Sequence, residues 1–200
     1  FIYMNENEDW FRKLLSYEPR GNDYMSCTLI TEPCLPEADV GVLYFETSGW
    51  LPMCGHDTMG VAVALIETGM VDVTEPVTVI RLDTAAGLIT VEAKVANGVV
   101  QEVSFTNAPA FVLRQDLTVE TRDFGFLTMD VSWGGNLYAI LPADSVGIPI
   151  CPQNGARLVE AAQSIAADIN RQVDFRHPDL QFVEQVTHVE FYGKPRTVDA

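Results

Sequence analysis

The sequence predicts an α+β protein of two units, because one order of elements occurs twice along the chain: strands, then a helix, then strands. The first unit is expected to cover residues 1–110 and the second residues 111–200, with the second unit incomplete. The boundary is placed near Ala108 to Val112, because Asn107-Ala108-Pro109 interrupts the strand pattern there. A content of 48% hydrophobic residues is sufficient for a substantial core.

The first unit is expected to begin with a short helix. Asn5, followed three residues later by Glu8, resembles a capping box for it. The other elements expected here are a turn at 18–21, strands at about 24–30 and 41–47 separated by a loop, a turn at 48–49, a helix described below, and strands at 77–83, 87–96 and 99–106. Asn97-Gly98, between the last two strands, is the strongest hairpin signal in the sequence.

The second unit is expected to contain several strands and one amphipathic helix. The strands are predicted near 111–113, 117–120, 126–133, 137–141 and 183–192. The helix is predicted over 155–170, with Asn154 as its N-cap. One face of this helix is apolar, since Leu158, Ala161, Ala162, Ile165 and Ile169 share it.

Charge and cysteine content limit the classes of partner. The chain has 12 Lys and Arg residues against 28 Asp and Glu residues, a net charge of −16, which disfavours binding to nucleic acid or to an anionic membrane. No window is apolar for long enough to span a bilayer. The four cysteines form no CxxC pair and no zinc spacing, and no signal peptide is expected, so a reduced, cytoplasmic setting is expected.

The most informative stretch is residues 52–60, which carry Cys54 and His56 between glycines just before the apolar run Val61–Ile66. A helix that is apolar all round is expected inside a domain. Its N-terminus would direct Cys54 toward a cleft, beside backbone N–H groups that have no partner within the helix. Such a place suits the activation of a thiolate and the binding of a carboxylate.

Other interpretations of these residues are plainer. Cys54 could be an ordinary buried cysteine, because free Cys is among the most buried residue types, and His56 could be a surface or capping residue. The remaining cysteines and histidines are expected to be passive or structural: Cys27, Cys34, Cys151, His177 and His188. No GxGxxG motif, P-loop or metal-ligand cluster is present, so no nucleotide, pyridoxal phosphate or metal cofactor is expected.

Several motifs in order give the chain a resemblance to a known family. They are Glu18-Pro19-Arg20-Gly21, Met53-Cys54-Gly55-His56, Trp133-Gly134-Gly135-Asn136-Leu137-Tyr138-Ala139, His177-Pro178 and Val189-Glu190-Phe191-Tyr192-Gly193. With these, the chain resembles the proline racemase family, which includes 4-hydroxyproline 2-epimerases and trans-3-hydroxyproline dehydratases. The likeness extends over nearly the whole chain.

The resemblance implies the diaminopimelate-epimerase-like fold, in which two similar domains each wrap strands around a central helix. The active site of that family lies between the domains, and each domain contributes one catalytic cysteine. Cys54 would be the first; the second would lie beyond Ala200, and the family's opening strand before Phe1. The chain is therefore expected to be a fragment that does not turn over alone, and the complete protein is expected to be a homodimer.

By the same resemblance, the site residues are Cys54 as a catalytic acid or base and Gly55, His56, Asp57 and Thr58 as substrate contacts. Inverting a carbon α to a carboxylate needs proton removal from one face and proton return to the other. A thiol suits this role, because its pKa of about 8.5 falls at a helix N-terminus. Asp57 departs from the Gly or Asn usual in the family, so either its side chain turns outward or the binding mode differs.

The function expected is a cofactor-independent racemase or epimerase that acts on proline or hydroxyproline through two catalytic thiols. One alternative is a trans-3-hydroxyproline dehydratase, in which the second cysteine is a threonine. Nothing before Ala200 separates these two reactions. The other alternative is a catalytically inactive, truncated polypeptide.

Overall fold

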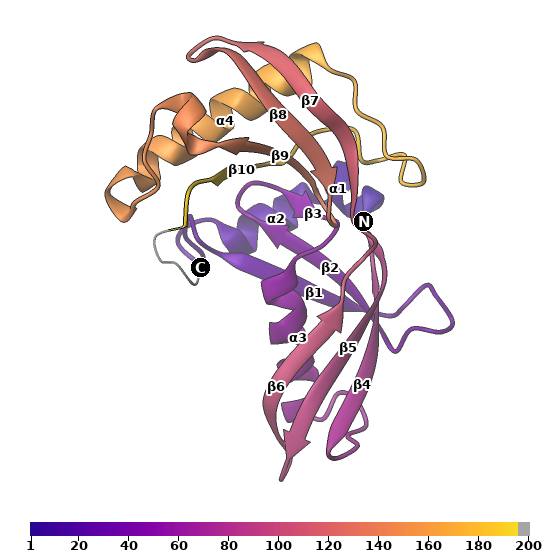
Figure 1. Cartoon of the computed structure of the whole chain (residues 1–200). Coiled ribbons are helices and arrows are strands. Elements are labelled where there is room, and N and C mark those ends of the chain that lie inside the picture. The colour runs from indigo at the N-terminus through magenta and orange to yellow at the C-terminus, as the bar shows by residue number, and fades with distance from the viewer. Residues whose placement is uncertain (196–200) are drawn as a thin grey trace. The chain divides into compact units, whose positions relative to one another are not determined.

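The computed structural model describes residues 1–195, and the chain divides into two compact units, Phe1–Ala108 and Pro109–Ala200 (Figure 1). The division between Ala108 and Pro109 lies within the stretch from Ala108 to Val112 where the sequence places the boundary. Each unit contains a sheet packed against a long helix, so the α+β composition predicted from the sequence is present in both.

The first unit is a six-stranded sheet with three helices. Its elements are α1 (Ile2–Asn7), α2 (Asp9–Ser16), β1 (Ser26–Thr31), β2 (Val40–Glu46), β3 (Trp50–Leu51), α3 (Gly55–Glu67), β4 (Val77–Thr84), β5 (Gly87–Ala96) and β6 (Val99–Thr106). The strand order is β1-β2-β4-β5-β6, with β3 paired to β2. Strands β2 and β4 run parallel, since α3 lies between them in the sequence and carries the chain back across the sheet.

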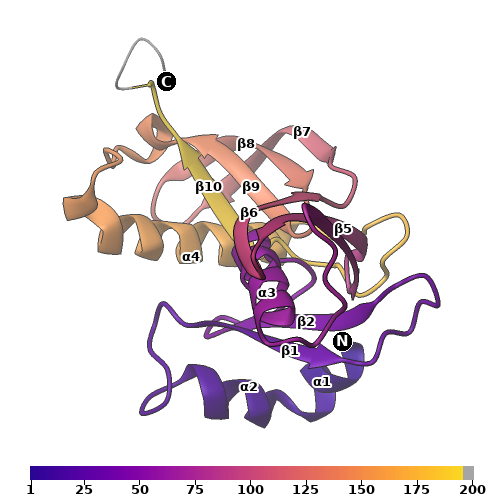
Figure 2. The same cartoon turned by 90° about the horizontal axis from the view of Figure 1, so that it is seen from below.

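Strand β2 lies between helices on its two faces, because successive side chains of a strand point in opposite directions. Tyr44 points toward α3, and its hydroxyl reaches Thr58 of that helix. Phe45 points toward α2, where its ring lies 6.0 Å from the ring of Phe11 and 4.9 Å from that of Trp50. Figure 2 shows α3 and α2 on opposite sides of β1 and β2.

Helix α3 is buried on one face only. Its core-facing residues are Thr58, Val61, Ala62, Leu65 and Ile66. The residues Met59, Gly60 and Ala64 on the other face are exposed. The prediction of a helix enclosed all round is therefore wrong for the described residues, because the sheet covers only the side of α3 that meets β1, β5 and β6.

Most predicted strands of this unit are confirmed. The Asn97-Gly98 turn has positive φ at both residues, 54° and 75°, as a two-residue hairpin of type I′ requires. The predicted capping box is wrong: Asn5 lies inside α1, which already begins at Ile2, and α2 starts after Glu8 without a side-chain cap. The short strand β3 was not predicted, since only two residues pair there.

The predicted turn at 18–21 is present, and its geometry explains why residue 21 is a glycine. The backbone N–H groups of Arg20 and Gly21 both donate to the Tyr17 carbonyl. A Cβ on Gly21 would lie 2.0 Å from the carbonyl oxygen of Ser16, so no other residue fits without moving the backbone.

The second unit is a four-stranded sheet with one long helix. Its elements are β7 (Phe111–Thr121), β8 (Gly125–Trp133), β9 (Leu137–Pro142), the 3₁₀ turns η1 (Ala143–Val146) and η2 (Pro152–Asn154), α4 (Gly155–Gln172) and β10 (His188–Tyr192). The order is β10-β9-β8-β7, with β10 parallel to β9. The buried face of α4 includes the predicted apolar residues Ala161, Ile165 and Ile169.

Three details of this unit differ from the predictions. The strands expected at 111–113 and 117–120 are one strand, β7, whose register shifts near Asp116 (φ 50°); the Asp116 N–H donates to Asp130 at 2.9 Å. The last strand begins at His188 rather than at 183, because the Asn170 side chain bonds both the N–H and the carbonyl of Val186. Asn154 holds the N-cap position of α4, but its side chain donates to the Pro149 carbonyl instead.

A buried carboxylate fixes α4 to the turn after β7. Asp168 is fully buried and accepts hydrogen bonds from the Arg122 backbone N–H at 2.8 Å and from its guanidinium at 2.9 Å. Arg171, one turn along α4, also donates to it. The Arg122 backbone bond, with the two guanidinium groups, lowers the pKa of Asp168 despite its burial.

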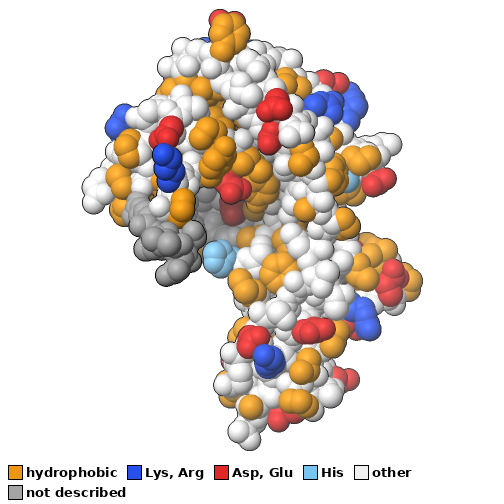
Figure 3. Space-filling view, viewed as in Figure 1, with side chains coloured by type: hydrophobic (Ala, Val, Ile, Leu, Met, Phe, Trp, Pro, Cys, Tyr) orange, Lys and Arg blue, Asp and Glu red, His pale blue; other side chains and the backbone are white. Residues whose placement is uncertain are grey.

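The surface fits the acidic composition. Acidic side chains are spread over the visible face rather than gathered in one place (Figure 3). Among residues 1–195, none of the helices combines the length and apolar character needed to cross a membrane.

The buried side chain of His177 stabilises the turn that follows it, before β10. It is buried between the rings of Phe111 and Trp133, with ring centroids 5.3 and 4.5 Å away. Its Nδ1 accepts hydrogen bonds from the backbone N–H groups of Asp179 and Leu180, so this nitrogen carries no proton. Burial lowers the pKa of His177, since a charged ring would lose both bonds inside an apolar setting.

We predict that this histidine makes stability depend on pH. Because folding lowers its pKa, its contribution is complete above about pH 6.5 and is lost as the pH falls below that value. The free energy of unfolding, measured by urea denaturation between pH 7.5 and 5, should decline less steeply in His177→Asn, whose side-chain oxygen keeps an acceptor but does not titrate. Equal slopes in the two proteins would contradict this prediction.

Candidate functional site

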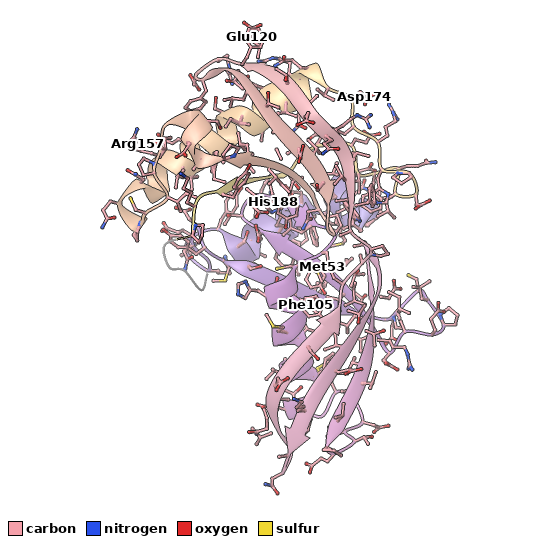
Figure 4. All side chains as sticks on the ribbon, in the orientation of Figure 1. Met53, Phe105, Glu120, Arg157, Asp174 and His188 are labelled. Carbon is pink, nitrogen blue, oxygen red and sulfur yellow. The ribbon has the colours of Figure 1, made fainter. Side chains whose placement is uncertain are left out.

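Cys54 stands at the start of α3, as predicted. It is the N-cap residue, with extended backbone angles (φ −139°, ψ 118°), and the helix begins at Gly55. Met53 before it is buried in the core, and the Phe105 ring of β6 lies behind Gly55, 3.4 Å from where a Cβ would stand. Figure 4 shows Met53 and Phe105 on the same side of this helix start. The chain around Cys54 is thus fixed by apolar packing.

A buried pair of hydroxyls fixes the helix start further. Thr58 and Tyr44 both have no exposed surface. The Thr58 hydroxyl donates to the Cys54 carbonyl at 2.7 Å, and the Tyr44 hydroxyl lies 2.7 Å from the same Thr58 oxygen. Since the one hydrogen of Thr58 goes to the carbonyl, Tyr44 donates to Thr58. Burial raises the pKa of Tyr44 to about 12, so this donor keeps its hydrogen.

The thiol of Cys54 is half-buried and has polar neighbours on two sides. Its Sγ lies 4.0 Å from the hydroxyl of Ser26, at the long end of the range for a hydrogen bond to sulfur. The backbone N–H of Asp57 is near enough to lower the pKa of the thiol, although it forms no regular capping bond. Burial and the negative charge of Asp57 act in the opposite direction, and the pKa of Cys54 is raised overall. The predicted fall of this pKa at the helix N-terminus is therefore wrong, because desolvation is the larger effect.

The other four residues predicted as substrate contacts differ in where their polar groups are directed. Asp57 is held toward β1, where its carboxylate accepts a hydrogen bond of 2.7 Å from Ser26. Thr58 uses its hydroxyl and its N–H on the Cys54 carbonyl, so this geometry favours a positioning role for it. His56 is exposed and forms no hydrogen bond or ion pair within the described residues. Gly55 presents only backbone beside the thiol.

This arrangement can bind a small anion beside an acid or base. The N–H groups of Gly55 and His56 precede the first intrahelical bond, which runs from Thr58 to Cys54. Such groups, at the positive end of a helix dipole, bind carboxylates. Within residues 1–195, no three His, Cys, Asp or Glu side chains come together as metal ligands.

Two residues of this site were not predicted. Ser26 belongs to a strand 28 residues earlier than Cys54, and nothing in its local sequence marks it. Tyr44 carried a weak signal, since it is a polar ring in a strand that is otherwise apolar. The remaining cysteines are all free thiols away from helix starts of this kind: Cys27 in β1, the exposed Cys34, and Cys151 before η2. His188 stacks on Tyr138 at 4.9 Å, and Gly134-Gly135 form the turn between β8 and β9.

We predict that the hydroxyl pair below Cys54 contributes measurably to stability. Thr58→Val keeps the shape of the side chain but leaves the buried Tyr44 hydroxyl without its acceptor, which should lower the free energy of unfolding by about 1–3 kcal/mol. Thr118→Val is the matched control, because its hydroxyl faces Thr128 at 3.0 Å on an exposed surface. That change should stay within about 0.5 kcal/mol. Equal effects of the two substitutions in urea denaturation would contradict the prediction.

Comparisons of the chain with known proteins point to one family. The family model for proline racemase matches residues 1–200. The chain is 48% identical over 183 residues to a 4-hydroxyproline 2-epimerase of Streptosporangium roseum, covering 92% of this chain and 55% of that protein. It is 38% identical over 198 residues to a proline racemase of Clostridioides difficile, covering 99% of this chain and 59% of that protein.

A solved structure agrees in fold. A hydroxyproline epimerase from Agrobacterium vitis with bound trans-4-hydroxy-L-proline superposes with a TM-score of 0.91 at 30% identity, covering 99% of this chain and 58% of that one. The chain thus spans 55% to 59% of the length of these relatives. Since the family model covers the chain from end to end, the chain belongs to the proline racemase family.

Proposed function

We propose that the whole protein is a cofactor-independent epimerase that inverts the α-carbon of 4-hydroxyproline, with Cys54 as one of two catalytic thiols. The observation that carries this proposal is the free, half-buried thiol of Cys54 at the N-terminus of α3 in a chain of the proline racemase family. Racemases and epimerases of this family are isomerases that differ in substrate.

The choice of 4-hydroxyproline over proline rests on the relatives. Identity is 48% with the 4-hydroxyproline 2-epimerase and 38% with the proline racemase. The Agrobacterium vitis relative holds trans-4-hydroxy-L-proline in its structure. A hydroxyl on the substrate ring would need a polar partner, because a buried polar group without one is costly.

The proposed mechanism uses the helix start in two ways. The free N–H groups of Gly55 and His56 bind the substrate carboxylate and stabilise the negative charge that develops on it when the α-proton leaves. Cys54 exchanges a proton with one face of the α-carbon, while a second thiol, supplied from outside residues 1–200, exchanges a proton with the other face. His56, exposed beside them, would contact the ring nitrogen. The homodimer and the cytoplasmic location belong to the same proposal.

We predict that Cys54→Ser in the whole protein lowers the rate of α-proton exchange by at least about 100-fold, since general acid–base catalysis typically contributes that much. The rate is measured by proton NMR in D₂O with trans-4-hydroxy-L-proline, with L-proline run in parallel as the competing substrate. Cys34→Ser is the matched control, because Cys34 is an exposed free thiol outside the site.

Unchanged exchange in Cys54→Ser would refute the role of Cys54. A higher kcat/KM for L-proline than for its hydroxylated form would refute the choice of substrate. Loss of water from a 3-hydroxyproline, without inversion of the 4-hydroxy substrate, would assign the protein to the dehydratases.

A further inference from the structure

The hydroxyl of Ser26 lies between two groups that compete for its single hydrogen. One is the Asp57 carboxylate, 2.7 Å away, and the other is the Cys54 sulfur, 4.0 Å away. A hydrogen bond to a carboxylate at the shorter distance is charge-assisted, whereas one to sulfur at the longer distance is weak. Ser26 therefore donates to Asp57.

This donation leaves only the lone pairs of the Ser26 oxygen to face the sulfur. A protonated Cys54 can donate its S–H to that oxygen, so the thiol is accommodated. A thiolate would instead face an oxygen lone pair of a hydroxyl that is already bonded to the Asp57 carboxylate. The order of hydrogen bonds, from Cys54 to Ser26 to Asp57, thus favours the thiol form of Cys54 and disfavours the thiolate.

The remaining groups around the sulfur do not reverse this preference. Strand β2 contributes Glu46, whose charge also disfavours a thiolate, and the neutral hydroxyl of Tyr44. Strand β1 carries Cys27 next to Ser26, and burial and Asp57 raise the pKa of that thiol as well. On α3, the Asp57 backbone N–H favours the thiolate, and His56 is exposed. A hydrogen bond donated by Ser26 to the sulfur would also lower the pKa of Cys54, but the single hydrogen of Ser26 is held by Asp57 at the much shorter distance. In the described part of the chain, no cation is among the groups that shift the pKa of Cys54.

We propose that Ser26 and Asp57 form a proton-ordering pair that keeps Cys54 in its thiol form in the free protein. Resting on the proposed function, this makes Cys54 the proton donor when the free protein takes up substrate, and the step leaves Cys54 as a thiolate. In that step the Cys54 S–H bond breaks and its proton forms the new bond to the α-carbon, while the opposite base takes the original α-proton. Ser26 and Asp57 are positioning residues, because they act on substrate only through Cys54.

The test measures the pKa of Cys54 in the whole protein without substrate. The rate of alkylation by iodoacetamide is followed from pH 6 to 10, and modified residues are identified by tandem mass spectrometry. The exposed thiol of Cys34 serves as an internal reference for the reagent. Asp57→Asn should lower the pKa by about one unit and raise the alkylation rate of Cys54 at pH 7 about tenfold. A charge is lost, and the new amide N–H can donate to the Ser26 oxygen, which turns the Ser26 hydrogen toward the sulfur. Glu46→Gln, the matched charge removal on β2, should have a smaller effect.

Ser26→Ala gives the sharper result, because its effect should change sign. With Asp57 present, removing Ser26 removes an acceptor of the S–H bond, so the pKa of Cys54 should fall. In the Asp57→Asn background, removing Ser26 removes a donor to the thiolate, so the pKa should rise. The same sign in both backgrounds, or an unchanged pKa in Asp57→Asn, would overturn the proposal. Since no turnover is needed, this outcome is independent of the exchange assay on Cys54→Ser.

Discussion

The hydrogen bond from the Thr58 hydroxyl to the Cys54 carbonyl is the interaction on which the site depends. This bond closes the first turn of α3. The Tyr44 hydroxyl, on strand β2, donates to the Thr58 oxygen. Because the Thr58 and Tyr44 side chains are fully buried, the start of the helix cannot move without breaking their hydrogen bonds. The sheet, through one tyrosine, therefore determines where the cysteine stands.

A second constraint is the balance of charge at the sulfur. The N-terminus of a helix favours a thiolate, but burial and the Asp57 carboxylate favour a thiol, and the latter effects are larger here. A site of two exchanging thiols needs one member in each protonation state. An acidic residue in the first turn of α3 is compatible with such a site when its cysteine is the protonated member, which gives Asp57 a role other than contact with the substrate carboxylate.

Local signals in the sequence were sufficient for much of this structure. The helix after Cys54, the strands β4 to β6 and the Asn97-Gly98 turn follow from periodicity and turn chemistry over a few residues. The contact between Ser26 and Asp57 spans 31 residues and depends on how β1 pairs with β2, which no local pattern encodes. The continuity of β7 was missed for a related reason, since a side chain of the neighbouring strand, Asp130, supports its irregular part. The exposed face of α3 could not be foreseen from composition, because apolar residues occupy both of its faces.

A crystal structure of the whole protein with trans-4-hydroxy-L-proline bound would test the role of Cys54 most directly. We expect the substrate carboxylate to lie on the N–H groups of Gly55 and His56, with the Cys54 sulfur about 3–3.5 Å from the α-carbon, as a reacting pair requires. A substrate bound away from the start of α3, or with its α-carbon out of reach of Cys54, would contradict the assignment of this cysteine to catalysis.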